Sequence, residues 1–150
     1  MTTDTIEREI SIQAPIERVW ALVTQAEHLG TWFGDAGADI DLRPGGAIEV
    51  RWDGHGLDGV VHAVDPTNLF AFRWRQLAVP AGTELGDGNS TLVEFRLEEV
   101  GAATRVLLVE SGFDALALPE DDRLAMHAAH TGGWEREIGE LGTHADSVAA

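Results

Sequence analysis

Alternating apolar and polar residues extend over about seventy positions from Ala36, and this pattern most limits what the chain can fold into. Side chains on a strand point to opposite faces in turn, so a period of two predicts strands with one buried face. Short turns rich in Gly, Pro, Asp and Asn divide the run, and no helical pattern interrupts it. The expected strands are 36–42, 48–52, 60–64, 70–74, 91–97 and 104–110. Strands joined in this way form an antiparallel meander.

Patterns of a different period flank the meander. Residues 6–13 alternate like one more strand. Pro15 marks the start of a short amphipathic helix, because its fixed φ suits a first helical turn, and a second short helix follows. From Pro119 to Ser147 apolar side chains recur at steps of three and four, which predicts one long C-terminal helix. Its adjacent Gly132 and Gly133 indicate a close approach to sheet backbone or to a ligand.

No repeat or linker divides the chain, so we expect residues 1–150 to form a single domain. The expected fold class is α+β. Its order is a strand, two short helices, and an antiparallel meander of about six strands curved around one long C-terminal helix.

Composition removes several function classes. The chain has 26 Asp and Glu against ten basic residues, a formal charge of −16, and such a surface repels nucleic acid. It contains no Lys, Cys or Tyr, which excludes lysine Schiff bases, thiolate nucleophiles, disulfides and phenol catalysis. The longest apolar run, Val19 to Val23, is far below the ~20 residues of a membrane span. The polar, acidic start lacks the features of a signal peptide, so we expect a cytoplasmic protein.

Several short motifs occur in a characteristic order along the whole chain. They are Ala14-Pro15-Ile16-Glu17-Arg18-Val19-Trp20, Trp32-Phe33-Gly34, Gly45-Gly46, Val64-Asp65-Pro66, Phe72-Arg73-Trp74, Thr104-Arg105-Val106, Glu110-Ser111-Gly112-Phe113 and Gly133-Trp134. Together with the expected element order, they resemble the helix-grip fold of the START-related, birch-pollen-allergen-like (SRPBCC) superfamily. Within it, the chain looks most like the bacterial branch named after the activator of the heat-shock protein 90 ATPase.

This resemblance implies a cavity between sheet and long helix that binds a hydrophobic or aromatic small molecule, lipid-like or polyketide-like, without a cofactor. Three alternatives stay open: a polyketide cyclase or hydratase-like enzyme, a chaperone ATPase activator-like interaction module, and a self-resistance protein for a toxic natural product. The eukaryotic activators carry an additional N-terminal domain for which this chain has no room, so we expect a ligand rather than a chaperone partner. The sequence leaves a homodimer and catalysis open.

Aromatic residues on neighbouring strands are the first candidate site. By alternation Trp52, Phe70, Phe72 and Trp74 lie on the face opposite the arginines, where they either line a pocket or pack as core. We expect them to bind ligand.

Glu110 and the long helix supply the polar candidates. Glu110 continues an inward strand face, where it is a strand-end ion-pair partner, a ligand anchor or an acid–base group. His127, Thr131 and Trp134 lie on the expected sheet-facing stripe, so we assign them to the ligand site, with His127 and Glu110 as catalytic candidates.

The sequence gives weaker grounds for assigning His130 and His62 to a site. His130 falls on the flank of that stripe, and His127, His130 and Glu110 lack a further well-spaced metal ligand, so we expect no metal. Val61 and Val64 are out of phase, which indicates a bulge beside His62 and leaves its orientation open.

Overall fold

A computed structural model describes residues 4–76, 79–80 and 82–148. Its elements in chain order are β1 (Thr5–Ile12), α1 (Ile16–Thr24), α2 (Ala26–Trp32), β2 (Ala38–Ile40), β3 (Ala47–Trp52), β4 (His55–Asp65), β5 (Leu69–Arg75), β6 (Ser90–Val100), β7 (Ala103–Ser111), the 3-10 turn η1 (Phe113–Ala115) and α3 (Glu120–Val148). Pro15 directly precedes α1, as its helix-start signal predicts, and its carbonyl accepts the N–H of Val19 at 3.1 Å.

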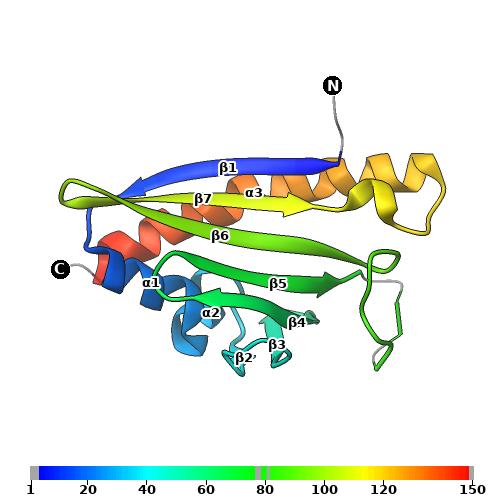
Figure 1. The fold of residues 1–150 in the computed structure, drawn as a ribbon, viewed down its shortest axis with the longest axis horizontal. Coiled ribbons are helices and arrows are strands. Elements are labelled where there is room, and N and C mark those ends of the chain that lie inside the picture. Colours follow the sequence, from blue (N-terminus) through cyan, green and yellow to red (C-terminus); the bar gives the residue numbers. More distant parts are fainter. Residues whose placement is uncertain (1–3, 77–78, 81, 149–150) are drawn as a thin grey trace.

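The strands form one antiparallel sheet in the order β1-β7-β6-β5-β4-β3-β2 (Figure 1). Strands β2 to β7 are neighbours in sequence order, as the short turns between them predict. The first strand then pairs with the last, with Ile6 opposite Glu110. The expected helix-grip fold class is confirmed. The register of β4 on β5 shifts between Val61 and Ala63, which confirms the bulge, and His62 there is exposed.

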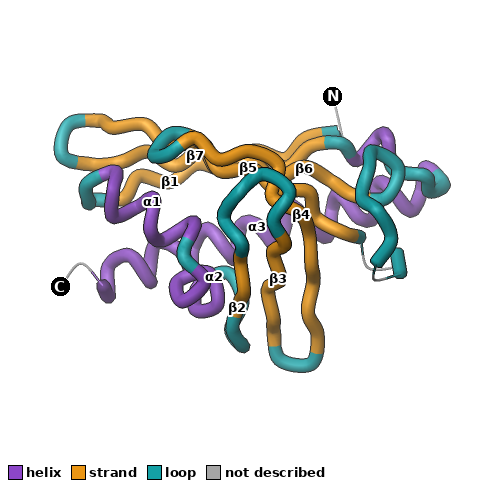
Figure 2. Tube along the Cα trace, turned by 60° about the horizontal axis from the view of Figure 1, so that its bottom comes forward, coloured by secondary structure: helices purple, strands orange, loops and turns teal. Residues whose placement is uncertain are grey.

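Helix α3 runs along the sheet beside β1 and β7, and α1 and α2 pack near its C-terminal part (Figures 1 and 2). The apolar residues of β1, α1, α2 and the meander strands form the core between these layers. Within the part of the chain that the structure describes, every helix is too short or too polar to span a bilayer.

The two halves of α3 are buried to different degrees. All five of its buried residues lie in the C-terminal half: Trp134, Glu137, Ile138, Leu141 and Ala145. No residue from Glu120 to Gly133 is fully buried. The helix is therefore packed into the core at one end and lies over the sheet with looser contacts at the other.

Candidate functional site

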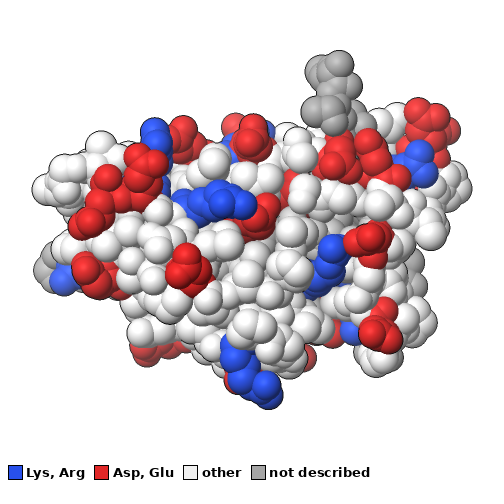
Figure 3. All heavy atoms as spheres, in the orientation of Figure 1, with Lys and Arg blue, Asp and Glu red and all other residues white. Residues whose placement is uncertain are grey.

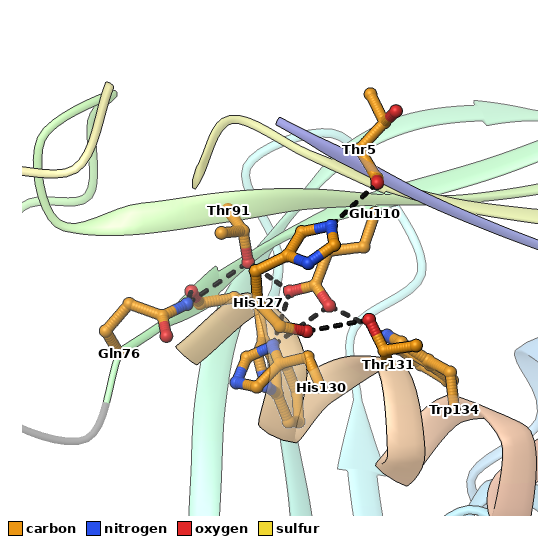
Figure 4. Close-up of polar contacts among 9 residues, drawn as sticks. Thr5, Gln76, Thr91, Glu110, His127, His130, Thr131 and Trp134 are labelled. Carbon is orange, nitrogen blue, oxygen red and sulfur yellow. Dashed lines mark hydrogen bonds and ion pairs between the residues drawn. The ribbon is translucent and has the colours of Figure 1, made fainter. Parts of the chain in front are cut away.

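Glu110 is the centre of a buried hydrogen-bond network at the junction of these two halves. Its side chain is completely buried on β7. Three groups donate to the carboxylate: the hydroxyl of Thr91, Nδ1 of His130 at 3.0 Å and Nε1 of Trp134 at 2.8 Å (Figure 4). Burying a carboxylate is costly unless it is paired and hydrogen-bonded, so these three donors explain why the fold tolerates Glu110.

A second layer of hydrogen bonds fixes the direction of these donors. The side-chain amide of Gln76 donates to the Thr91 hydroxyl oxygen at 3.1 Å and to the backbone carbonyl of Trp74 at 3.1 Å. Because Thr91 accepts from Gln76, its own O–H is directed toward Glu110. The carboxylate therefore receives hydrogen bonds from every neighbour that contacts it in this network.

Four aromatic rings pack together beside this network. The ring of Phe33, just after α2, stacks on Trp134 with 5.1 Å between ring centroids and lies 5.5 Å from Trp74. It contacts the ring of Trp52 edge-on at 5.3 Å. Offset-stacked and edge-to-face rings at these separations attract each other. Phe33 thus joins β3, β5 and α3 in one aromatic cluster.

Gly34 lets Phe33 reach this position. A Cβ on Gly34 would lie 2.4 Å from the backbone oxygen of Arg51 and 2.6 Å from Val50 Cγ1, both on β3. Such contacts are far shorter than van der Waals distances, so any other residue would push the end of α2 away from the sheet. The Trp32-Phe33-Gly34 motif therefore builds part of the cluster.

The aromatic cluster and Glu110 share a cavity of about 140 Å³. Its lining residues are Phe33, Trp52, Leu57, Trp74, Glu110, Ala129, His130, Gly133 and Trp134. An apolar cavity of roughly 150 Å³ holds one benzene molecule. The cavity is therefore the size of a single aromatic ring, with walls that are largely apolar and one ionisable pair, Glu110 and His130, on one side.

Four of the eight residues that the sequence assigns to the ligand site meet at this cavity: Trp52, Trp74, Glu110 and Trp134. Phe70 and Phe72 share the sheet face of Trp74, as predicted, but they lie deeper. Both are fully buried and pack on Phe95, so they support the cavity as core residues.

His127 and Thr131 lie beside this cavity without lining it. Nε2 of His127 is 2.9 Å from the backbone carbonyl of Thr5, to which it donates, and its ring lies edge-on against Phe113. Thr131 donates to the carbonyl of His127 one turn earlier in α3. Neither residue lines the cavity. His127 therefore lies outside the wall of this cavity and attaches α3 to β1.

His130, placed on the flank of the helix by the sequence pattern, is the histidine that faces the site. It lies one turn before Trp134, at a spacing of four residues, so both side chains leave α3 on the same face. Both reach Glu110. A buried carboxylate requires hydrogen-bond donors. This requirement explains why His130 faces the sheet although the apolar pattern of the helix places it on the flank.

Five lining residues were missed by reasoning from sequence: Phe33, Leu57, Ala129, His130 and Gly133. The His130-x-x-x-Trp134 spacing and the Trp32-Phe33-Gly34 motif were available signals. Leu57 and Ala129 carry no distinguishing signal. For Gly133 the sequence left two alternatives: the close approach of sheet backbone is absent, since an added Cβ would meet no described atom within 4 Å, and the approach of a ligand stays a prediction. Gly133 leaves open space in the cavity wall.

A second, larger cavity of about 440 Å³ shares Phe33 and Trp52 with the first. Its wall includes the buried Glu137 with Asp35 and Glu140. Burial raises the pKa of the Glu137 carboxyl to about 7, against the opposing charge of Arg136, and the two neighbouring carboxylates add to the increase. Among the described residues, no group of three or more His, Asp or Glu side chains is placed to hold a metal ion.

Comparison with solved structures finds the same fold in several other proteins. A protein from Mesorhizobium loti, MLL2253, is 22% identical, with a TM-score of 0.77 over 95% of this chain and 97% of that one. The Aha1 dimer from Colwellia psychrerythraea is 23% identical, with a TM-score of 0.70 over 95% and 94%. DynU16, a protein of the dynemicin biosynthetic locus, is 25% identical, with a TM-score of 0.75. The match covers 95% of this chain but 47% of DynU16.

No curated protein matches the sequence at a significant level. The family model described as activator of Hsp90 ATPase homolog 1-like protein matches residues 13–146, which include every residue of the Glu110 network and of the aromatic cavity. The chain therefore belongs to the family of proteins like the activator of Hsp90 ATPase homolog 1, within the helix-grip superfamily that its motifs resemble.

Proposed function

We propose that this protein binds a hydrophobic, aromatic small molecule in the cavity between Phe33, Trp52, Trp74 and Trp134. The observation that carries the proposal is a ring-sized space with aromatic walls at the point where α3 stops packing into the core. Binding sites for small molecules are concave and mostly apolar, with few polar groups that set orientation. Here Glu110 and His130 are those polar groups.

The volume of the cavity and the net charge of the protein limit which ligands can bind. About 140 Å³ accommodates one aromatic ring, so a larger lipid-like or polyketide-like molecule would place a single ring inside and the remainder at the mouth. Acidic side chains lie across the face seen in Figure 3, with isolated arginines among them. With a formal charge of −16 the protein repels anions, and the largely apolar walls of the cavity make the burial of a cation costly. We therefore propose an uncharged aromatic ligand.

The cyclase-like, chaperone-activating and self-resistance alternatives remain predictions. The relatives named after Hsp90 activation and the DynU16 locus support a shared fold, and their partners are not carried over to this chain. A homodimer and a cytoplasmic location are likewise predictions.

The test uses a matched pair of glycine variants. A Cβ on Gly132 or on Gly133 would meet no described atom within 4 Å, and only Gly133 lines the cavity. Leucine at either position also gains helix propensity over glycine, so both variants should fold. Gly133→Leu fills the cavity, whereas Gly132→Leu leaves it open.

Binding is measured by titrating 4-fluorotoluene and following its ¹⁹F NMR signal. Wild type and Gly132→Leu should show the same saturable change, and Gly133→Leu should show none. Trp74→Ala should weaken binding, since it removes one wall. No saturable change with wild type, or an unaltered titration with Gly133→Leu, would contradict the proposal.

A further inference from the structure

His130 has one ring nitrogen whose partner the structure does not supply. Its Nδ1 contacts both oxygens of Glu110, at 3.0 and 3.1 Å. A carboxylate with three donors around it accepts, so Nδ1 carries a proton and donates it. Nε2 points away from Glu110 (Figure 4) and has no hydrogen-bond partner among the described residues. In the neutral imidazole, Nε2 is then an acceptor with a free lone pair.

The other polar side chains of the cavity either already accept hydrogen bonds within the protein or can only donate them. Oε1 of Glu110 accepts from Trp134 and His130, and Oε2 accepts from Thr91 and His130. Trp52 and Trp74 have indole N–H groups, which are donors only. Among the described lining residues, Nε2 of His130 is therefore the one side-chain acceptor that is left for a ligand.

These complementary groups define which ligand substituent fits. A hydroxyl group donates one hydrogen bond and accepts others, so it can satisfy Nε2 and still receive an indole N–H. An ether or ketone only accepts and leaves Nε2 without a partner. A carboxylate brings negative charge to a protein of net charge −16, next to the buried Glu110. A neutral phenolic hydroxyl donates to Nε2, can accept from an indole N–H and carries no negative charge.

We propose that Nε2 of His130, held in place by Glu110, is the hydrogen-bond acceptor that makes the cavity selective for aromatic molecules carrying a hydroxyl group. This inference rests on the proposed binding of an aromatic ring in the same cavity. His130 is the residue that contacts the ligand. Glu110 is a positioning residue that fixes the tautomer and the orientation of the imidazole.

The experiment compares 4-fluorophenol with 4-fluorotoluene, because a hydroxyl and a methyl group are similar in size. With wild type, ¹⁹F NMR titrations should give a dissociation constant about five- to tenfold lower for the phenol, the value of one net hydrogen bond. His130→Phe keeps a ring at this position and removes Nε2. It should bring the ratio of the two dissociation constants to about one, whatever its absolute affinity for 4-fluorotoluene.

The other helical histidine supplies the matched control. His127 donates to Thr5 and does not line the cavity, so His127→Phe should keep the preference for the phenol. A measurement on the unmodified protein avoids any effect of substitution on folding. The ¹⁵N signal of His130 Nε2 should shift when 4-fluorophenol is added, and should not do so with 4-fluorotoluene.

The outcomes separate the two proposals. If wild type binds both compounds equally, or if His130→Phe retains the preference, selectivity through Nε2 is wrong while binding in the cavity stands. If neither compound binds wild type, the proposed function itself is wrong.

Discussion

The two halves of α3 are attached to the same sheet in different ways. From Trp134 to Val148 the helix contributes five buried residues and packs into the core. Here His144 also lies 2.9 Å from His28, which ties the helix to α2. From Glu120 to Gly133 no residue is fully buried, and the attachment consists of hydrogen bonds from His127 and His130 together with the partly buried Met126.

The difference shows where a ligand site can form in this fold. Close packing of apolar side chains leaves no space for a ligand. A helix segment that has no fully buried residue leaves such space between itself and the sheet. The cavity lies at the boundary between the two modes, with Gly133 and Trp134 both in its wall. The following predictions test this contrast between an apolar and a polar attachment.

The largest expected effect is on the apolar half. Leu141 is fully buried, whereas Leu124 in the other half is 42% exposed. Leu141→Ala should lower the free energy of unfolding by about 2–5 kcal/mol because it leaves a cavity. Leu124→Ala should change it by less than about 0.5 kcal/mol. Equal losses in chemical denaturation would show that the two halves are packed alike.

A pH-dependent effect is expected at Glu137, also in the apolar half. Its pKa of about 7 is above the ordinary value of 4.5, so the folded state binds this proton more tightly than the unfolded state does. The stabilisation is present below pH 4.5 and is lost as the pH rises to about 7.

Glu137→Gln removes this dependence and should be more stable than wild type above pH 7, by about 1–3 kcal/mol. Thermal unfolding across this pH range, compared with Glu135→Gln at an exposed position, is the measurement. A wild-type stability curve with the same shape as that of the variant would contradict it.

A smaller gain is expected at the glycines that separate the halves. Alanine at Gly132 or Gly133 should stabilise the protein by about 1 kcal/mol each, since glycine disfavours helix and the space around both is open. Denaturant titrations of the two variants would measure the gain. A loss of stability at either position would mean that the glycine is needed for packing.

An effect of similar small size is expected on the polar half. His127→Phe removes one hydrogen bond to Thr5, which should cost about 0.5–1.5 kcal/mol. Hydrogen exchange should increase in residues 120–133 and stay unchanged in residues 134–148. An increase spread evenly along α3 would indicate that the helix behaves as one unit.

The order and pairing of the strands could be predicted from the sequence because alternation and turn residues are local signals. The bulge between Val61 and Ala63 could be predicted for the same reason, because the alternation of apolar and polar residues changes phase there. The inward position of His130 on α3 could not be predicted from the sequence. It depends on Glu110, a residue distant in sequence whose buried carboxylate takes its donors from His130 and Trp134.

The sequence pattern also could not show which aromatic residues of β5 line the cavity and which are core. Phe70, Phe72 and Trp74 alternate identically along β5, yet only Trp74 reaches the cavity. Phe70 and Phe72 pack against Phe95 on the neighbouring strand β6, whereas Trp74 packs against Phe33, which follows α2. Such long-range packing carries no local periodicity.

The most direct test of the account is a crystal structure of the protein with 4-fluorophenol. The account predicts the ring beside Trp74 and Trp134, next to Gly133, with its hydroxyl oxygen within hydrogen-bonding distance of Nε2 of His130. A ring bound in the cavity beside Glu137, or one in the predicted cavity with its hydroxyl turned away from His130, would contradict it.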